Sequence, residues 1–503
     1  MHQTAFDLDT KLLSFSFKNT ECEWTIREAV EGLQIFGGIG SGKTSGSGRT
    51  IALKYLKAGF GGLVLTVKPD EREQWEEYCK LTGRENDLIV VAPGLKNYFN
   101  FLEYESSQKG IQKSTSENLV QVLKTVIRAS EEKSSGKSDD PFWETALDML
   151  MSNVIDLCLL AYGKISVQKL YDIAQSAPRK ETPASEGEQN KAFAKAFMQA
   201  SDNVTRQIEA FENSLTFEEK ERLKDPEIFE NEICNAVQDA RTLKFVDQFF
   251  IESFMNLSEK TRSIIDFSFS GFLYSLLREP IYSLFCRHSS TFTPDDCLKG
   301  KIIVIDLPIK YHHKVGRDSQ ILFKYIWQRA MEKRNIKEND RPVFLWADEA
   351  QNFLHEYDPE YQATARSSRI ATVYISQNLP NYHANMGGAK SEFRVKSFLG
   401  TLGTKIFHAN ADIETNRYAS DLIGDGVFEE TSETATAAGQ FSASQTKSIK
   451  FERIIRPEEF TRLKTGSPQN NFKVEGYMHV QGMSQKNGLS FAKATFNQNY
   501  IPH

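Results

Sequence analysis

The segment LQIFGGIGSGKTSGSGRT, residues 33–50, constrains the fold more than any other part of the sequence. It contains two similar phrases, GSGKT and GSGRT. A phosphate-binding loop needs a Gly five residues before the Gly that precedes its basic residue, because the backbone must curl around the phosphates. Gly37 and Gly42 have this spacing ahead of Lys43, whereas the second phrase has Lys43 where a Gly is needed. Only the first phrase is therefore predicted to bind phosphate.

The context of the first phrase strengthens this prediction. An apolar run, residues 33–36, leads into the loop, and IALKYLKAGF after it has a helical pattern. Backbone N–H groups of the loop and of the helix N-terminus would hold the phosphates, with Lys43 at the β- and γ-phosphates and Thr44 on Mg²⁺. A Gly-rich structural turn is the alternative interpretation. Gly46 and Gly48 remain unexplained, since each costs about 1 kcal/mol inside a helix. The residues predicted to bind ATP are Gly37, Gly38, Gly40, Ser41, Gly42, Lys43 and Thr44.

The phrase PVFLWADEAQNF, residues 342–353, supplies the acidic half of such a site. A buried strand ends there at two neighbouring carboxylates. We expect Asp348 to support Mg²⁺ from its outer coordination sphere and Glu349 to orient and polarise the attacking water. An acidic pair after a strand is otherwise an ordinary solvated strand end.

A third group of candidates lies in ATARSSRIATVYISQNLPNY, residues 363–382. Gln377 ends a predicted strand, where its amide could sense the γ-phosphate. Arg366 and Arg369 precede that strand, and an Arg there could stabilise the charge of phosphoryl transfer in a neighbouring copy. Exposed arginines at a helix end explain either one equally well.

Short, nearly continuous apolar runs recur along the chain and indicate buried parallel strands covered by helices. Helical patterns alternate with several of them, which predicts a doubly wound α/β fold. The strand pattern stops in the middle of the chain, where helical spacing dominates, for example in DPFWETALDMLMSNVIDLCLLAY. We therefore predict a discontinuous α/β core, residues 1–107 and 280–503, with an inserted all-helical domain, residues 108–279.

Near the C-terminus, ETSETATAAGQFSASQTKS, residues 430–448, is small and polar and predicts a loop. FKVEGYMHVQG and LSFAKATF alternate as strands and predict a hairpin around MSQKNG. The net charge of −6 shows no basic field for nucleic acid, and the six cysteines have no metal-binding spacing. No signal peptide and no transmembrane segment are predicted.

Taken in order, the motifs resemble the conjugative-transfer or type IV secretion coupling ATPases of the TraG/TraD kind, within the HerA/FtsK group of ring motors. The matching phrases are GGIGSGKT, VKPDE, YFNFL, DPFWETALDML, GKIIVIDLPI, FLWADEAQNF, ATARSSRIATVYISQ, TKIFHANADIET and IIRPEEFTRLKTG. Their order along most of the chain carries the resemblance, more than any single phrase beyond the loop. The inserted helical region also falls where that family has an all-helical domain.

The resemblance implies a RecA-like core, a hexamer that uses ATP and Mg²⁺, DNA or a nucleoprotein as substrate, and a secretion-channel or membrane-anchor protein as partner. It favours Arg366 over Arg369, because the family's finger Arg sits about eleven residues before the Gln. Two departures stand out: the family usually opens with transmembrane helices, and its acidic residue after the second strand is Thr66 here, with Lys68 and Asp70 or Glu71 as imperfect equivalents.

Three functions follow. The first is a motor for DNA or a nucleoprotein in the bacterial cytoplasm, which either is recruited to the inner membrane by a separate protein or works away from membranes. The second is a secretion or assembly ATPase that acts on protein, which the acidic balance favours. The third is a nucleotide-gated adaptor without motor activity.

Overall fold

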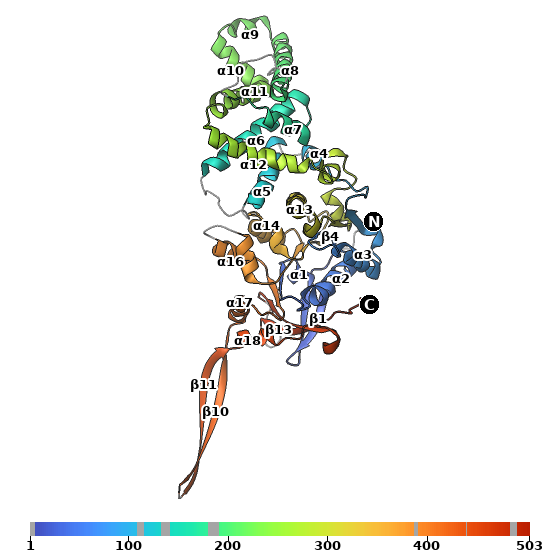
Figure 1. The fold of residues 1–503 in the computed structure, drawn as a ribbon, viewed down its shortest axis with the longest axis vertical. Helices are drawn as coiled ribbons and strands as arrows, with labels where there is room; N and C mark the ends of the chain where they lie inside the picture. Colours follow the sequence, from blue (N-terminus) through green and yellow to red (C-terminus); the bar gives the residue numbers. More distant parts are fainter. Residues whose placement is uncertain are drawn as a thin grey trace. The chain divides into compact units, whose positions relative to one another are not determined.

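The computed structural model describes residues 6–107, 115–131, 141–179, 191–386, 391–438, 440–482 and 490–502. The chain forms two compact units (Figure 1). Unit 1 comprises Met1–Val90, Pro294–Tyr311 and Trp327–His503, and unit 2 comprises Val91–Thr293 and His312–Ile326. The domain boundaries at 107/108 and 279/280 remain a prediction from the sequence.

Unit 1 is built on a nine-stranded sheet in the order β13-β12-β9-β3-β8-β7-β4-β6-β5. Its strands are β3 (Leu33–Phe36), β4 (Gly61–Leu65), β5 (Leu88–Val91), β6 (Ile302–Ile305), β7 (Val343–Ala347), β8 (Ile370–Ser376), β9 (Thr404–Phe407), β12 (Lys473–Val480) and β13 (Phe491–Asn497). The pairs from β9 to β6 are parallel, whereas β12 is antiparallel to both β9 and β13. The predicted mainly parallel sheet and the predicted C-terminal hairpin are confirmed; the turn between its strands lies outside the described residues.

Helices accompany this sheet in the alternating order that the sequence predicts. They are α1 (Ile26–Ala29), α2 (Arg49–Lys57), α3 (Glu71–Thr82), α14 (Asp358–Ala365), α15 (Leu379–Asn385), α16 (Ser391–Gly400), α17 (Ile413–Ile423) and α18 (Pro457–Thr461); α13 (Ile309–Glu332) contributes residues to both units. Aromatic side chains join α3 to β7, because the Trp75 ring lies 5.5 Å from that of Phe344 and 5.4 Å from that of Trp346. Such ring pairs add stability beyond the apolar area that they bury.

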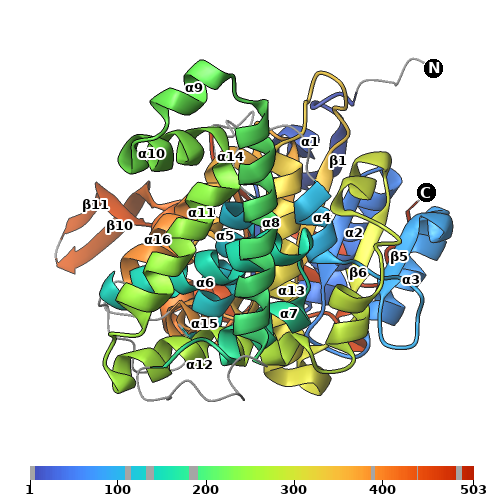
Figure 2. The ribbon, with the colours of Figure 1, turned by 90° about the horizontal axis from the view of Figure 1, so that it is seen from above.

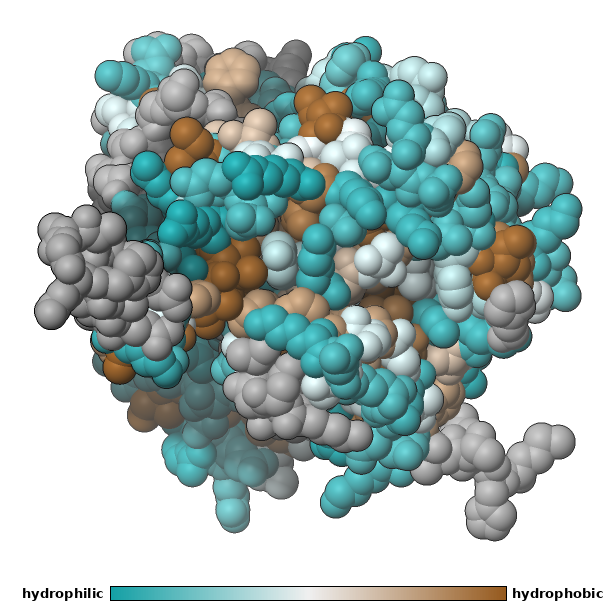
Figure 3. All heavy atoms as spheres, turned by 90° about the horizontal axis from the view of Figure 1, so that it is seen from below, coloured by the Kyte–Doolittle hydropathy of each residue, from teal (hydrophilic) through white to brown (hydrophobic). Residues whose placement is uncertain are grey.

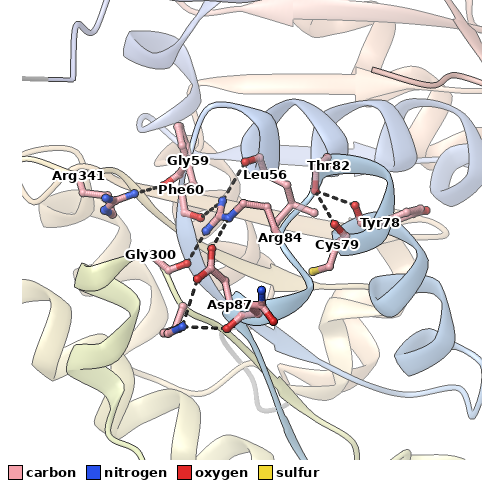
Figure 4. A network of polar contacts seen from close by, with 12 residues as sticks. Leu56, Gly59, Phe60, Tyr78, Cys79, Thr82, Arg84, Asp87, Gly300 and Arg341 are labelled. Carbon is pink, nitrogen blue, oxygen red and sulfur yellow. Dashed lines mark hydrogen bonds and ion pairs between the residues drawn. The ribbon is translucent and has the colours of Figure 1, made fainter. Parts of the chain in front are cut away.

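A guanidinium fixes the edge of unit 1 where α2 ends and β4 begins (Figure 4). Arg84 donates to the carbonyls of Leu56 and Phe60 at 2.8 and 3.2 Å and to the carbonyl of Gly300 at 2.5 Å. Its Nε donates to Asp87 at 2.6 Å. One side chain therefore satisfies carbonyls at the end of α2, before β4 and before β6, which ties the end of α2 to the start of two strands.

Two strands near the N-terminus, β1 (Lys11–Phe17) and β2 (Thr20–Thr25), form an antiparallel pair that the sequence analysis did not identify. The pair is tied to the main sheet by Trp24, whose Nε1 donates to the Thr404 hydroxyl at 3.0 Å inside the protein. Alternation in these strands is irregular, and their burial depends on partners hundreds of residues away.

Unit 2 is built from helices, as predicted for the middle of the chain. They are α4 (Phe101–Ser107), α5 (Thr115–Glu131), α6 (Pro141–Tyr162), α7 (Val167–Gln175), α8 (Ala192–Ser214), α9 (Phe217–Arg222), α10 (Pro226–Ala236), α11 (Gln238–Gln248) and α12 (Glu259–Leu276). Figure 2 shows α8 and α11 side by side, and α6 packs against both.

Within the described segments, residues 142–162 of α6 are the one helix long and apolar enough to cross a membrane by length and composition. The side chains of Leu150, Met151, Val154, Ile155 and Cys158 have no exposed surface. They pack among other helices of unit 2, which is the arrangement of a core helix.

The predicted loop at residues 430–448 is wrong. Strands β10 (Asp425–Ala438) and β11 (Gln440–Arg453) pair there as an antiparallel ribbon without a register shift. The residues that flank the low-complexity stretch include Val427, Phe428, Ile449 and Phe451, and β-branched and aromatic residues favour strands. The small polar residues in the middle show no strand pattern, whereas the residues at both ends of the ribbon do.

Candidate nucleotide-binding site

The phosphate loop begins where β3 ends and is attached to the ends of both neighbouring strands. Gly37 N–H donates to the carbonyl of Ser376 at 3.3 Å, and Gly38 N–H donates to the carbonyl of Ala409 at 2.9 Å. Gly42 has a φ of 82°, a left-handed conformation that glycine adopts without strain. The predicted loop therefore has the backbone shape that its glycines allow.

The two glycines that the sequence left unexplained lie in a wide helical turn, Lys43–Gly48, which leads into α2. A Cβ on Gly46 would lie 3.0 Å from the Cβ and Cγ2 of Val474, and a Cβ on Gly48 would lie 3.0 Å from the carbonyl oxygen of Lys43. Close packing against β12 and against the loop itself explains both positions. Glycine suits both positions because an added Cβ would force a neighbouring atom to shift.

Thr44 and Asp348 meet, although 304 positions separate them in the sequence. The Thr44 hydroxyl donates to Asp348 Oδ2 at 2.9 Å, and the Lys68 ammonium donates to the same oxygen at 3.1 Å. Asp348 is 3% exposed, so its carboxylate is held by these two donors away from bulk water. A hydroxyl and a carboxylate side by side at a phosphate loop are oxygen ligands of the kind that Mg²⁺ prefers.

Glu71, at the start of α3, is a second buried carboxyl in this cluster. It accepts hydrogen bonds from the N–H groups of Val67 and Lys68 at 2.6 and 3.2 Å. Burial, followed by the charge of Asp348, raises the pKa of Glu71 to about 8. Burial alone would disfavour the charge of Lys68, but the carboxylates of Asp348 and Glu71 raise the pKa of its ammonium. The VKPDE phrase thus contributes Lys68 and Glu71, not Asp70, to the site.

Glu349 is held by two amides in a conformation that is unusual for its residue type. Its φ is 50° and its ψ is 49°, the left-handed region that costs a non-glycine residue about 1 kcal/mol or more. Gln377 donates to Glu349 Oε1 at 3.1 Å, and Gln351 donates to Oε2 at 2.9 Å. Backbone strain of this kind persists where the surroundings over-determine it, which is common at functional sites.

His408 belongs to the site but was missed by the sequence analysis. Its Nδ1 lies 2.8 Å from the carbonyl oxygen of Glu475, and its Nε2 lies 2.7 Å from the hydroxyl of Ser47. Burial lowers the pKa of His408 to about 4, so the ring is neutral at pH 7. Because a carbonyl only accepts, Nδ1 carries the proton and Nε2 accepts from Ser47. The ring therefore anchors the turn that follows Lys43, and nothing in its sequence neighbourhood signals this role.

The two candidate finger arginines differ in their surroundings. Arg369 donates to the carbonyls of Phe6 and Asp340 at 2.8 and 3.0 Å and to the Asp340 carboxylate, which is a structural role. Arg366 is 63% exposed and forms an ion pair with Glu31 at 3.2 Å. It borders an open cavity of about 560 Å³ together with Glu31 and Gln362, away from the phosphate loop. The structure brings Lys43, Thr44, Asp348, Glu349 and Gln377 together but leaves Arg366 apart.

The loop also contains a buried hydroxyl, that of Ser41, which could bind a ligand. Ser41 is 2% exposed, and its hydroxyl has no hydrogen-bond partner within the described part of the chain. A buried hydroxyl without a partner is costly, whereas a phosphate oxygen would accept from it. Together with Lys43 and the loop N–H groups, this atom fits a nucleotide phosphate.

Comparisons with known proteins identify a similar fold and one matching sequence segment. Residues 342–465 match the family model described as the TraM recognition site of TraD and TraG. The fold is similar to that of the bacterial conjugative coupling protein TrwBdeltaN70 in its unbound form, with 14% identity, 97% of this chain and 89% of that chain covered, and a TM-score of 0.62. It is also similar to the plasmid coupling protein TrwB in complex with the ATP analogue ADPNP, with 13% identity, 94% of this chain and 87% of that chain covered, and a TM-score of 0.57. The structure of TrwB with ADP and Mg²⁺ matches with 13% identity, 95% of this chain and 88% of that chain covered, and a TM-score of 0.57. No curated protein sequence matches the chain.

These findings confirm the predicted resemblance to coupling ATPases of the TraG/TraD kind. They confirm the predicted fold, a RecA-like α/β core with a helical part, and the match covers 97% of the chain. The sequence likeness lies in the segment that contains Asp348, Glu349, Arg366 and Gln377.

Proposed function

We propose that this chain is an ATP-hydrolysing ring motor that couples DNA, or a nucleoprotein, to a conjugation or type IV secretion machinery. The observation that carries the proposal is the meeting of Thr44, Asp348, Glu349 and Gln377 at one phosphate loop. The coupling-protein fold supports the choice of substrate. TrwB, which has this fold, was solved with an ATP analogue and with ADP and Mg²⁺.

The residues divide the work of hydrolysis as follows. The loop N–H groups, the Ser41 hydroxyl and Lys43 bind the phosphates. Thr44 and Asp348 would hold Mg²⁺, which offsets the negative charge that develops on the phosphates. Glu349 orients and polarises the attacking water, and its carboxylate is positioned for this by the amides of Gln351 and Gln377.

Gln377 would couple the state of the γ-phosphate to movement of the segment that follows β9. Its side-chain amide donates to Glu349, and its backbone carbonyl accepts from the Asn410 side-chain amide at 2.8 Å. A shift of Gln377 would therefore move Asn410, which lies just beyond β9. We propose Arg366 as the residue that a neighbouring copy inserts toward the γ-phosphate. The partners proposed with this role are further copies of the chain in a hexamer, DNA, and a secretion-channel or membrane-anchor protein that recruits the protein from the bacterial cytoplasm to the inner membrane.

Steady-state ATP hydrolysis tests the proposal. Wild type, Lys43→Ala and Glu349→Gln are compared without DNA and with single-stranded or double-stranded DNA, at two salt concentrations. We expect DNA to stimulate hydrolysis, with a strong loss as salt rises because phosphate contacts release counterions. Both variants should abolish hydrolysis, and Glu349→Gln should retain nucleotide binding.

A second candidate, a secretion or assembly ATPase acting on protein, is favoured by the net charge of −6. It predicts hydrolysis that is lost in Lys43→Ala but indifferent to DNA and nearly flat with salt. An adaptor that binds nucleotide without turnover would show negligible hydrolysis in wild type and no effect of Glu349→Gln. Each outcome selects one function and excludes the other two.

A further inference from the structure

The ribbon of β10 and β11 has no described neighbour strand on either outer edge. Each strand has 14 residues, so the ribbon is about 45 Å long at roughly 3.3 Å per residue. Figure 1 shows it leaving unit 1 next to α17 and α18. A two-stranded ribbon is marginally stable on its own in water, and its unpaired edges are templates for another strand.

The two edges carry charges of opposite sign. Acidic side chains on β10 outnumber basic ones, and the reverse holds on β11. Among the side chains described, residues 425–431 include Asp425, Glu429 and Glu430 with no Lys or Arg, and residues 447–453 include Lys447, Lys450 and Arg453 with Glu452 as the one acid. Lys450 pairs with Glu430, and Arg453 pairs with Asp425, across the ribbon within one chain. Exposed ion pairs of this kind contribute little, so they exchange readily for equivalent pairs with another strand.

Apolar side chains lie on one face of the ribbon, the face that also carries Asp425, Glu429, Lys447 and Arg453. Val427 is opposite Phe451 in the register, and Ile449 is two residues from Phe451 on the same face. Their exposed fractions are 62%, 78% and 66%. The view from below shows separate apolar patches among mainly hydrophilic side chains (Figure 3). Each strand edge therefore offers both an apolar group and charges to a partner.

We propose that β10 of one copy of this chain pairs with β11 of the next copy, so that the ribbons close into a β-barrel around the axis of a ring. Pairing of identical edges would place acid against acid or base against base, which is unfavourable directly across strands. Acidic and basic edges attract only in a head-to-tail arrangement, and such contacts form a ring when the rotation between successive copies closes, as the proposed ring motor requires. Closure removes both free edges. This inference rests on the ring motor proposed above.

A lipid surface is a poorer occupant for the apolar face. Glu429 follows Val427 on that face, and Lys447 and Arg453 flank Ile449 and Phe451. Insertion would bury these charges in hydrocarbon, which is strongly unfavourable. Between two copies the same charges meet partners of opposite sign.

Charge reversal on one edge at a time tests the pairing. The variant Glu429→Lys/Glu430→Lys makes both edges basic, and Lys447→Glu/Lys450→Glu makes both acidic. Each alone should weaken self-association by at least tenfold in light scattering with ATP analogue present. A one-to-one mixture should restore assembly to within threefold of wild type, because basic and acidic edges then alternate. The chain with all four substitutions is the matched control and should assemble as wild type.

A cysteine pair gives an independent readout. Val427→Cys and Phe451→Cys are made in separate chains and mixed; oxidation should cross-link chains only in the mixture, beyond the background of wild type. Equal assembly of each charge-reversed variant, failure of the mixture, or a wild type that never assembles would overturn the proposal. Binding of wild type to phosphatidylcholine–phosphatidylglycerol vesicles, lost in Phe451→Ser with assembly unchanged, would identify a membrane as the occupant and also overturn it. The proposed ATPase is judged separately, by DNA-free hydrolysis and its loss in Lys43→Ala.

Discussion

Gly48 is the position where one added methyl group tests how the phosphate loop is built. In Gly48→Ala the new Cβ would lie 3.0 Å from the carbonyl oxygen of Lys43, which is backbone of the loop itself. Lys43 must then shift by a few tenths of an ångström. Gly46→Ala is the matched control, because the three atoms nearest its Cβ, at 3.0–3.2 Å, all belong to the side chain of Val474.

The expected magnitudes follow from these contacts. Ala in place of Gly gains about 1 kcal/mol of helix propensity. Overpacking costs about 1–3 kcal/mol, so each variant should lose between about 0 and 2 kcal/mol of stability. The nucleotide distinguishes them: a charged hydrogen bond from Lys43 contributes about 1.5–3 kcal/mol. Partial loss of it in Gly48→Ala should weaken ATP binding by about fivefold, or roughly 1 kcal/mol.

Binding of a fluorescent ATP analogue and thermal unfolding without nucleotide measure the two effects. Gly46→Ala should bind within about twofold of wild type, and Val474→Ala should relieve part of its destabilisation, because residues in contact are not additive. The reasoning is refuted if Gly48→Ala binds nucleotide as wild type does. It is refuted equally if Gly46→Ala weakens binding more than Gly48→Ala.

Three further predictions concern neighbouring groups. Gln377→Ala should lower kcat for ATP hydrolysis by about tenfold or more with nucleotide affinity nearly unchanged, because it removes a donor that orients Glu349; single-turnover kinetics and binding separate the two. Lys68→Met should lower the Mg²⁺ concentration for half-maximal hydrolysis by about fivefold, because the ammonium no longer competes with Mg²⁺ for Asp348. A Mg²⁺ titration of the hydrolysis rate measures this change. The folded pKa of His408 is depressed to about 4, so its contribution to stability should be constant above pH 6.5 and lost as pH falls toward 4, by at most about 3 kcal/mol. His408→Gln should flatten that part of a plot of melting temperature against pH, and an unchanged slope would exclude the assignment.

The sheet and the core of the site could be predicted because both depend on local patterns. Runs such as LQIF and VFLWA are apolar throughout, as a parallel strand covered on both faces requires. Asp348 directly follows VFLWA, and Thr44 ends the loop that follows LQIF. Parallel strands bring their carboxyl ends to one edge of the sheet, which places both residues at the edge where they meet.

The rest depends on partners that no local pattern specifies. The role of His408 depends on contacts with Ser47 and Glu475, which are distant in the sequence. Lys68 acquires its role from the carboxylate of Asp348, 280 residues away. The ribbon of β10 and β11 was hidden because small polar residues in a strand read as a loop when no buried face selects their alternation.

The same topology determines how Arg366 can act. β8 runs parallel to β3, with Ser376 beside Phe36, so the carboxyl end of β8 adjoins the phosphate loop. Arg366 precedes the opposite end of β8, and seven residues of strand span roughly 20 Å. No rotamer of an arginine covers that distance to its own nucleotide. If Arg366 stabilises phosphoryl transfer at all, it does so in another copy of the chain. In that case Arg366→Ala, like Lys43→Ala, should be inactive alone. The two variants should regain partial ATP hydrolysis when mixed, since the first supplies the nucleotide site and the second supplies the arginine. Persistent inactivity of a mixture that still forms mixed rings would leave Arg366 with its ion pair to Glu31 as a structural surface residue.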